Sequence, residues 1–535
     1  MKHILLAAFV ALSFNASAQP VFDWVETQPV GWDLNPSFTK HLVTTDGMNR
    51  SVAARFVSNT VDYTGLFGTY SIDVRESDGG LVWSYPLGNK VQVQAIAADA
   101  SGNVYIGGTF MQTLFHGAFD QLIHIGGVTD TFDVNAFLLK LDANGELEWI
   151  RNLEPLQPGL DNIADIRIDK DGDAWYAYNE TFSGLLQEID DNGTDVGFTR
   201  YIGGVRGISS FDFDPDNNIF ITGACDPGQV ELAPLEYDVT DSYNIYIAKF
   251  DAAGVGQWAK FAHDITFQMP VVECDASGNA FVGGTLMDTM TLGTHHLNAP
   301  QWVNDFWLTK VDGDGVFLWA KQGPQPMSLQ GDVARADGKF IDVDDAGDVY
   351  MLANVRGAND FGNGVFIDAG ATSQSNMAVI KFAGTDGEAQ WAANGGATSF
   401  NSTHQLALDE NDNIYFTQTL TDTANYGFIH IDIAYWTNHF TLGKITVLQD
   451  TSIGVSIEDI STKAFSLYPN PASTFVLIPL DLQGAELSVF DATGKQVAFY
   501  QGVGNKVDVE SLPNGVYTLR FTNERVRFVG KLLKE

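Results

Sequence analysis

The chain has 535 residues, with 29 basic against 67 acidic side chains and a formal net charge of −38 at pH 7. A surface this negative argues against nucleic acid, polyanions and anionic membranes as partners, and it favours solubility and cationic or basic partners. Glycine accounts for 53 residues, about a tenth of the chain against a usual ~7%. With 36 Phe, 17 Tyr and 11 Trp, the composition favours turns and sheet over helix.

The first residues predict export. Met1-Lys2-His3 is a short basic start, residues 4–12 are apolar, and Ala16-Ser17-Ala18 is a small-residue cleavage site. This pattern is typical of a secretory signal peptide over residues 1–18, with cleavage between Ala18 and Gln19. The apolar run is too short to span a bilayer, and no later stretch reaches the ~18 consecutive apolar residues of a spanning helix. No transmembrane segment is therefore predicted.

A turn signature, Asp-x-x-Gly-Asn followed by an alternating strand, recurs along the body of the chain. Residues 99–109 read DASGNVYIGGT, and residues 275–285 read DASGNAFVGGT. Looser copies make seven units in all and start at Asp46, Asp169, Asp214, Asp344 and Asp409. Asp and Asn bond their own backbone in tight turns, and glycine takes positive φ there. Each copy therefore predicts a β-hairpin within a repeat architecture.

A second signature follows each first one: a strand ending in Lys-apolar-Asp, a glycine turn, and a strand centred on Trp. Clear copies run from Lys140 to Trp149, from Lys249 to Trp258 and from Lys310 to Trp319, and weaker versions end at Trp83, Phe198 and Trp391. Each unit therefore holds four strands. Seven such units predict a seven-bladed β-propeller over residues 19–447.

The seventh unit runs through Gly443-Lys444-Ile445 into a linker without reaching a Trp strand. The missing strand lies at the other end of the propeller, because residues 22–25 (FDWV) read like the Trp strands. We therefore expect Trp24 to lie beside the seventh unit and the N-terminal strand to close the ring. A closed ring leaves only short, protected sheet edges.

This pattern resembles the bacterial seven-bladed β-propeller repeat family, whose units read as a Gly-Asn turn, an aromatic strand with Gly-Thr, and a later Lys-Leu-Asp before a glycine. The resemblance covers roughly residues 19–447, strongly in units two and five and more weakly in units one, three and seven. It implies an all-β propeller fold. It implies little about function, because propellers host unrelated activities.

The composition changes after a polar linker at residues 448–463, because the region from Ala464 to the end holds seven basic and seven acidic residues. Its landmarks are Tyr468-Pro469-Asn470-Pro471, LSVFDATGK with Gly494, LPNGVYTL with Gly515, and Lys531-Leu-Leu-Lys534. Residues 464–535 thus resemble a type IX secretion sorting domain. The resemblance implies a small immunoglobulin-like β-sandwich, the secretion machinery as a partner, and passage through the periplasm to the surface or exterior of a Gram-negative bacterium. An unrelated β-sandwich with a carbohydrate-binding role is the alternative.

The innermost strand of each unit differs between units at one position. Three residues before each motif Asp, every unit has an apolar residue, whereas two residues before it the units read Thr44, Ala97, Arg167, Asp212, Glu273, Asp342 and Ala407. Four neighbouring blades therefore aim charge the same way. Asp212, Glu273 and Asp342 are candidates to hold a cation such as Ca²⁺, or a basic group, with Arg167 as partner. Channel charges in contact with water are the alternative.

Connections between the second and third strands vary in length and content, as binding loops do. The aromatic and histidine residues there suit stacking on sugars or anchoring a protein. The candidate ligand-binding residues are Phe115, His116, His295, His296, Trp302, Trp436 and His439, and Phe119, His124 and Tyr426 fall in the same connections. Because a similar aromatic recurs in several units, part of this set is expected to be blade packing.

No catalytic residue stands out, because the chain contains no Gly-x-Ser-x-Gly elbow, His-Glu-x-x-His motif or phosphate-binding glycine loop. The turn at Asp169 resembles the start of a calcium loop, but Ala174 stands where that loop needs glycine. Cys225 and Cys274 either form one disulfide or are two buried small residues. Neither alternative is preferred.

These observations favour a non-enzymatic, extracellular binding or adhesion propeller for a glycan or a protein. The alternative is a propeller-fold polysaccharide lyase or glycoside hydrolase. A carboxylate pair ~5–10 Å apart in a deep pocket would favour the enzyme.

Overall fold

The computed structural model describes two compact units, which divide between Gln449 and Asp450. The described residues are 20–30, 41–57, 69–89, 91–110, 121–125, 128–132, 136–153, 162–180, 182–263, 270–299, 305–324, 333–335, 338–370, 375–397, 401–434, 437–447, 463–464, 471–478, 482–491, 495–522 and 527–534. Within these ranges no helix has the length and apolar character needed to cross a membrane.

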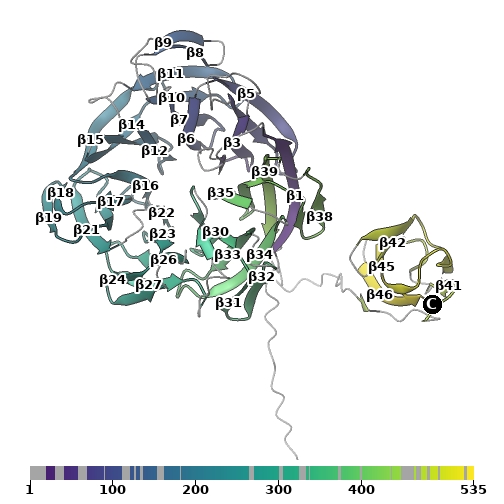
Figure 1. Ribbon diagram of the computed structural model, residues 1–535. Helices are drawn as coiled ribbons and strands as arrows, with labels where there is room; N and C mark the ends of the chain where they lie inside the picture. Colours follow the sequence, from purple (N-terminus) through teal and green to yellow (C-terminus); the bar gives the residue numbers. More distant parts are fainter. Residues whose placement is uncertain are drawn as a thin grey trace, which may run out of the picture. The chain divides into compact units, whose positions relative to one another are not determined.

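Seven four-stranded antiparallel sheets form the first unit, counted over the described residues, and they stand around a central axis (Figure 1). From the axis outwards, the first four blades are β2 (Leu42–Thr45), β3 (Ser51–Val57), β4 (Thr69–Arg75) and β5 (Leu81–Asn89); β6 (Val91–Ala98), β7 (Val104–Phe110), β10 (Ala136–Leu141) and β11 (Leu147–Leu153); β12 (Asn162–Ile168), β13 (Ala174–Glu180), β14 (Ser183–Ile189) and β15 (Asp195–Gly203); and β16 (Gly207–Phe213), β17 (Ile219–Cys225), β20 (Asn244–Phe250) and β21 (Gly256–His263).

The remaining three blades follow the same order. They are β22 (Val271–Cys274), β23 (Ala280–Leu286), β26 (Asp305–Val311) and β27 (Phe317–Gln322); β28 (Val333–Arg335) and β29 (Ile341–Val343) side by side on β30 (Val349–Val355), then β33 (Asn376–Phe382) and β34 (Ala389–Ala397); and β35 (Asn401–Leu408), β36 (Ile414–Leu420), β39 (His439–Val447) and β1 (Pro20–Pro29). The prediction of an all-β, seven-bladed propeller is confirmed.

The ring closes through its N-terminal strand, as the sequence predicted. Strand β1 pairs antiparallel with β39, and Trp24 lies opposite Lys444. The Trp24 Nε1 donates a hydrogen bond to the Ser77 carbonyl in the first blade, at 3.0 Å. One strand thus completes the seventh blade and contacts the first, so both edges at the seam are covered.

The Trp strands join neighbouring blades through one recurring contact, here called the interblade joint. In each joint the indole Nε1 of one blade donates to a backbone carbonyl in the turn before the outer strand of the next blade. The bonds run from Trp24 to Ser77, Trp83 to Ala143, Trp149 to Asp191, Trp258 to Gly313 and Trp319 to Gly384, at 2.8–3.2 Å. The recurrence of Trp therefore has a structural explanation.

The other residues of the second signature also serve the joints. Gly145 has φ +83°, and a Cβ there would lie 2.7 Å from the Trp83 ring, so neither its backbone nor its neighbour leaves room for a side chain. Lys310 Nζ lies 2.8 Å from Asp275 Oδ2 and 4.7 Å from the centre of the Phe281 ring. Lys, Asp and Gly of the repeats are thus part of the scaffold.

The third blade departs from this pattern, because Phe198 stands where other blades have Trp. Arg200 makes the contact instead. Its guanidinium carbon lies 4.4 Å from the centre of the Trp175 ring, and its Nη2 donates to the Ala252 carbonyl of the fourth blade at 3.4 Å. A cation over an aromatic face replaces the indole there.

Five hairpins occupy connections between second and third strands. They are β8 (Gln121–Ile125) with β9 (Val128–Phe132), β18 (Gly228–Leu232) with β19 (Leu235–Val239), β24 (Thr289–Leu292) with β25 (His295–Asn298), β31 (Ala358–Gly362) with β32 (Val365–Asp368), and β37 (Ala424–Tyr426) with β38 (Ile429–Ile431). They lie at the periphery of the ring (Figure 1). Strands β18 and β37 pair with the outer strands β15 and β34 of the preceding blades. Because Met290, Leu292 and Leu297 are buried, such a hairpin packs one face on the blades.

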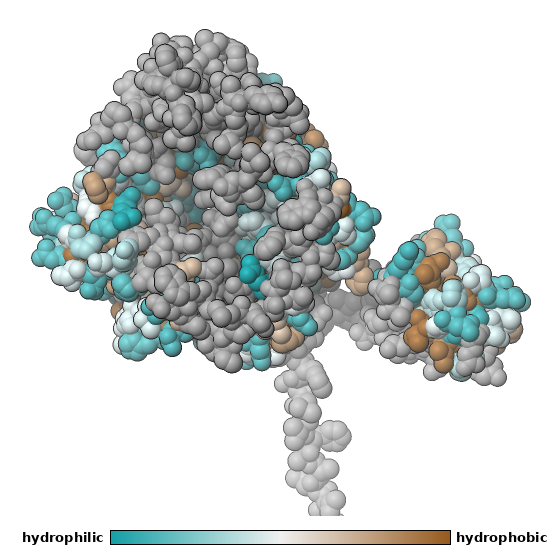
Figure 2. All heavy atoms as spheres, viewed as in Figure 1, coloured by the Kyte–Doolittle hydropathy of each residue, from teal (hydrophilic) through white to brown (hydrophobic). Residues whose placement is uncertain are grey.

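The second unit is a small β-sandwich. One sheet has the order β40 (Lys463–Ala464), β46 (Arg527–Lys534), β45 (Gly515–Thr522), β42 (Glu486–Phe490), β43 (Gln496–Tyr500), and the other pairs β41 (Phe475–Leu477) with β44 (Lys506–Asp508). Val476, Leu487 and Leu519 are among its buried core residues. Figure 2 shows hydrophobic residues at its surface as well, and Phe475, Phe499 and Val516 are exposed there.

Both cysteines are free thiols, so the disulfide alternative is not realised. Cys225 is fully buried in β17, and Cys274 is partly buried at the end of β22. Burial raises the pKa of the Cys225 thiol to about 12, which keeps it protonated and unreactive.

Candidate functional site

A pocket of about 500 Å³ opens where the inner strands meet. All seven blades contribute to its lining, so it lies at the axis of the ring. One part of the lining is apolar and includes Leu42, Ala95, Ala97, Ala98, Ala164 and Val271, and the rest is polar, with Thr44, Gln94, Asp165, Arg167, Ser209, Ser210, Asp212, Lys339 and Gln405. Its volume falls in the range of ligand-binding pockets, roughly 300–1,000 Å³.

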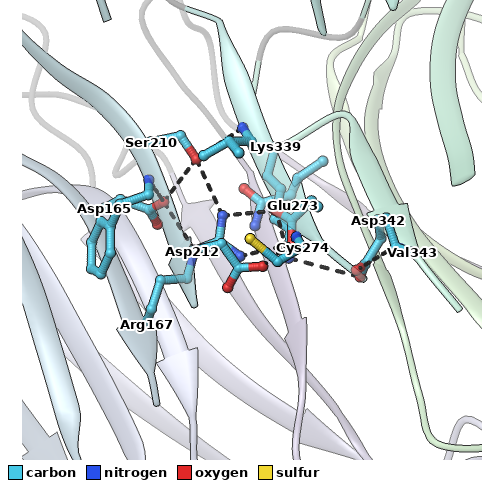
Figure 3. A network of polar contacts seen from close by, with 12 residues as sticks. Asp165, Arg167, Ser210, Asp212, Glu273, Cys274, Lys339, Asp342 and Val343 are labelled. Carbon is cyan, nitrogen blue, oxygen red and sulfur yellow. Dashed lines mark hydrogen bonds and ion pairs between the residues drawn. The ribbon is translucent and has the colours of Figure 1, made fainter. Parts of the chain in front are cut away.

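The inner-strand position that differs between blades faces this pocket in four of them. Thr44, Ala97, Arg167 and Asp212 belong to the lining. Glu273 is buried beside it, in the network of Figure 3. The alternation of the inner strands therefore directs the variable position towards the axis.

Arg167 is the centre of the network (Figure 3). Its Nη2 and Nη1 donate to the two carboxylate oxygens of Glu273 at 2.7 and 3.1 Å, and its Nε donates to Asp165 Oδ2 at 3.0 Å. A guanidinium that binds a carboxylate through two parallel bonds holds it in one orientation. One cation from β12 thus positions a carboxylate from β22, two blades away.

Lys339 supplies a second cation from the sixth blade. Its Nζ lies 3.2 Å from Glu273 Oε1 and 3.7 Å from Asp342 Oδ2. Asp342 Oδ2 also accepts a hydrogen bond from the Leu408 backbone amide of the seventh blade, at 2.9 Å. The network therefore links the inner strands of blades three to seven.

Asp165 and Asp212 bind backbone and hydroxyl donors of neighbouring blades. Asp165 Oδ2 accepts from the Ser210 hydroxyl at 3.1 Å, and Asp212 Oδ2 accepts from the Cys274 amide at 2.7 Å. Each carboxylate of the lining is thus anchored on the next blade. Sequence reasoning missed Asp165, although its place two residues before Arg167 was a usable signal, and it missed Lys339, which no repeat signature marks.

Burial and charge act together on these groups. Burial raises the pKa of Glu273 to about 7; Arg167 and Lys339 oppose the rise, and Asp212 and Asp342 add to it. Burial works against the charge of Arg167, but Asp165 and Glu273 raise its pKa well above the usual value. The pKa of Lys339 is also raised, because Asp342 and Glu273 outweigh burial and the repulsion of Arg167.

The predicted cation ligands do not converge on a shared centre. Glu273 and Asp342 face Lys339, while Asp212 bonds the Cys274 amide. Over the ranges that the structure describes, no group of three or more His, Cys, Asp or Glu side chains is arranged to hold a metal ion. The basic partner foreseen for these carboxylates is present within the chain, as Arg167 and Lys339.

The candidate ligand-binding residues are partly placed. Phe115, His116, Phe119, Trp302 and Trp436 lie outside the described residues, as does the side chain of His124. His295 Nε2 is 3.1 Å from the Phe317 carbonyl, and exposed His296 contacts the Thr291 hydroxyl through Nδ1 at 3.0 Å. His439 is half-buried at the start of β39, and burial lowers its pKa.

Tyr426 belongs to the blade core. It is buried, and its ring centroid lies 5.3 Å from that of Phe22 and 6.0 Å from that of Phe416. The structure therefore does not gather the placed candidates into one site. His295 and His296 sit on the β24–β25 hairpin of the fifth blade, whereas His439 begins β39 of the seventh.

The sorting landmarks are also partly placed. Tyr468, Pro469, Asn470 and Gly494 lie outside the described residues, as do Ala18 and Gln19 of the predicted cleavage site. Pro471 is exposed just before Ala472, whose amide bonds the Leu533 carbonyl at 2.9 Å. Gly515 pairs with Lys534, and Lys531 pairs with Thr518, between strands β45 and β46.

Comparison with known families bears on this second unit. Residues 466–535 match the family described as "Secretion system C-terminal sorting domain". The chain carries a type IX sorting domain. It is therefore carried across the outer membrane to the cell surface or the exterior, and the secretion machinery is a partner. A search of curated proteins finds no match.

Solved structures with propeller folds are similar to the chain. PorZ, described as an essential surface component of the type IX secretion system of Porphyromonas gingivalis, is 12% identical with a TM-score of 0.37, over 95% of this chain and 61% of PorZ. The Dos1 propeller is 9% identical with a TM-score of 0.37, over 78% and 95%. Virginiamycin B lyase from Staphylococcus aureus is 9% identical with a TM-score of 0.32, over 72% and 100%. At these TM-scores the likenesses carry no argument about function.

Proposed function

We propose that this exported propeller is a binding or adhesion protein that recognises a glycan or a protein outside the cell without transforming it. The axial pocket is the observation that carries the proposal. It combines an apolar part with fixed polar groups, which is the composition of a recognition site. Its charged side chains are already held by neighbouring blades, as Arg167 is by Asp165 and Glu273, so the pocket is organised before any ligand enters.

A polysaccharide lyase or glycoside hydrolase is the alternative, and one observation favours it. Glu273 has a pKa raised to about 7, as a general acid requires. Against this, both oxygens of Glu273 accept bonds from Arg167, and Lys339 lies 3.2 Å from one of them. A carboxylate in that position serves the wall of the pocket, which supports binding over catalysis.

A pair of assays on the full chain separates the two functions. Binding is measured on an array of glycans and by capture of extracellular proteins, and degradation is measured on the same glycans by release of reducing ends or unsaturated products. We expect binding without degradation. Degradation of any glycan that is lost in Glu273→Gln would establish the enzyme and contradict the proposal.

Calcium is tested separately, because a Ca²⁺ ion among Asp212, Glu273 and Asp342 would compete with Lys339 for Glu273 and Asp342. Titration calorimetry with CaCl₂ on the wild-type chain and on Asp212→Asn measures this competition. Heat that disappears in the variant would support a calcium site; equal heats in both proteins would place any calcium elsewhere.

The mature protein is proposed to begin at Gln19, after removal of a signal peptide at residues 1–18, and to consist of a propeller at 19–447, a linker at 448–463 and the sorting domain at 464–535. Intact mass measurement and N-terminal sequencing of the exported protein test both the cleavage site and whether the sorting domain is removed. A first residue other than Gln19 would contradict the proposed cleavage.

A further inference from the structure

Two aromatic residues have a backbone conformation that this chain otherwise gives to other residue types. The described non-glycine residues with positive φ are six, and four of them are Asn or Asp, which tolerate that region well. The other two are Phe182, with φ 66°, and Tyr243, with φ 61°. Glycine or asparagine would be favoured by the backbone at both positions.

Packing does not account for these residues. Phe182 has 66% and Tyr243 47% of its surface exposed. A strained backbone persists where the side chain is needed, and such positions cluster at ligand-binding sites. An exposed ring on left-handed backbone is therefore an observation about binding, and it occurs twice.

Both residues lie on the same rim of the ring. Phe182 is in the turn between β13 and β14, the second and third strands of the third blade, and Tyr243 immediately precedes β20, the third strand of the fourth blade. The strands of neighbouring blades run in the same sense around the axis, so these two connections emerge on one side.

A charge pair lies between the two residues. The Val205 amide donates to the Phe182 carbonyl at 3.3 Å. The next residue, Arg206, donates from Nε and Nη2 to the two oxygens of Asp226, both at 2.9 Å. Asp226 follows Cys225, which pairs with Asn244, the neighbour of Tyr243. We call Phe182, Arg206, Asp226 and Tyr243 the rim patch.

The turn that carries Tyr243 is braced from two sides. The Asn244 side chain donates to the Asp241 carbonyl, and His263 Nδ1 of β21 lies 2.9 Å from the Ser242 carbonyl. These contacts hold the backbone on either side of the ring. The Tyr243 ring is therefore presented in a fixed place, which lowers the entropy lost on binding.

We propose that the rim patch binds a neutral glycan, with sugar rings stacked on Phe182 and Tyr243 and hydroxyl groups hydrogen-bonded to Arg206 and Asp226. This rests on the proposed binding function and names the ligand class. The rings offer apolar faces, and Arg206 and Asp226 offer donors and acceptors beside them. A net charge of −38 disfavours an anionic polysaccharide. A stable protein interface needs about 800 Å² per partner around an apolar centre, whereas here a charge pair separates the two rings.

Asparagine variants of the full chain test the proposal, because the chain itself uses Asn at positive φ at Asn49, Asn217 and Asn363. Phe182→Asn and Tyr243→Asn are compared with Phe428→Asn, a matched control whose ring is 86% exposed at the β37–β38 turn of the seventh blade. Wild type is screened on an array of neutral and anionic glycans, and the strongest neutral oligosaccharide is then titrated into each protein by calorimetry. Thermal unfolding is recorded in parallel.

We expect each rim variant to lose at least tenfold in affinity while its Tm stays equal or rises, and the Phe428→Asn affinity to stay unchanged. Unchanged affinity in both rim variants, or a Tm that falls with affinity, would show that the rings do not stack on sugar. A wild-type chain that binds only anionic glycans, only proteins or nothing on the array also overturns the inference. Binding to protein alone would leave the proposed binding function standing, whereas degradation of the array glycans would remove that function itself.

Discussion

The outer strands of the propeller repeat one another closely, whereas the inner strands do not. At the outer strands, five interblade joints share an indole that bonds a neighbouring turn at 2.8–3.2 Å. At the axis, blades three to six carry Arg167, Asp212, Glu273 and Asp342, while the other three carry Thr or Ala at the same position. Repetition marks what each blade needs in order to pack on the next. Difference marks where the ring has acquired a particular surface.

The charged inner wall should be the most sensitive part of the molecule. Arg167→Leu leaves buried Glu273 with Lys339 alone and removes the bidentate bond. We expect the free energy of unfolding at pH 8 to fall by about 3–5 kcal/mol, because removing one partner strands a buried charge. Chemical denaturation measures it. The double variant Arg167→Leu/Glu273→Leu should recover much of the loss, and no recovery would mean that the pair is not the cause.

The interblade joint at the seam comes next. Trp24→Ala removes the half-buried indole of β1, with its bond to Ser77 and its contact with Tyr415 at a ring distance of 6.2 Å. Large aromatic truncations cost about 3–5 kcal/mol when fully buried, so a loss of about 2–3 kcal/mol is expected in denaturant titrations. Trp24→Phe keeps the packing and should lose only about 1 kcal/mol, the value of the hydrogen bond. Equal losses would show that packing contributes nothing at the seam.

The pH dependence of stability separates the inner wall from the His41 site, because the two have opposite signs. Glu273 has a folded pKa of about 7, above its model-peptide value of 4.5, so the folded state binds its proton more tightly. Its contribution is full below pH 4.5 and is lost as pH rises through 7, by about 2 kcal/mol. Urea titrations from pH 5 to 8 should show this fall, and Glu273→Gln should flatten it.

His41 acts in the other direction. Burial, His404 and Arg55 lower its pKa well below 6.5, so the unfolded state binds the proton more tightly and stability is lost as pH falls below 6.5. His41→Gln should make the protein more resistant to acid without changing the slope between pH 7 and 8. If that substitution instead removed the alkaline loss, the two assignments would have to be exchanged.

The smallest expected effect distinguishes turn strain from joint packing. Gly145→Ala and Gly172→Ala both place a side chain on left-handed backbone, with φ of +83° and +93°. Each should cost about 1–2 kcal/mol for that reason. Gly145→Ala should cost about 1 kcal/mol more, since its Cβ would meet the Trp83 ring at 2.7 Å, whereas nothing lies within 4 Å of the Cβ of residue 172. Equal losses in thermal unfolding would mean that the ring moves aside freely.

The blades and their closure could be predicted because they depend on local turn chemistry and strand alternation. The position of Trp24 beside the seventh blade followed from counting two signatures, and β1 pairs with β39 as expected. The inner wall followed only in part. A register shift between Ile163 and Asp165, and the division of the sixth inner strand into β28 and β29, interrupt the alternation on which such counting relies.

The rim patch could not be predicted from sequence, because the signal is a backbone angle. Nothing around Phe182 or Tyr243 in the sequence indicates positive φ, since the chain usually signals that conformation with Gly, Asn or Asp. The hairpins were misleading for the opposite reason. Their alternating residues suggested variable binding loops, yet Met290 and Leu292 pack on the blades, so a connection of variable length also serves the scaffold.

The closing strand has a consequence for the order in which the ring forms. Asp23 and Thr446, which meet at the seam, are 423 residues apart in the chain. The entropy of closing a loop grows only with the logarithm of its length, so this closure costs about 5 kcal/mol, but it cannot occur until the seventh blade has emerged and folded. Until then β39 remains an unpaired edge, open to a strand from another molecule. A newly exported chain is therefore most prone to aggregation just before its first strand finds its last.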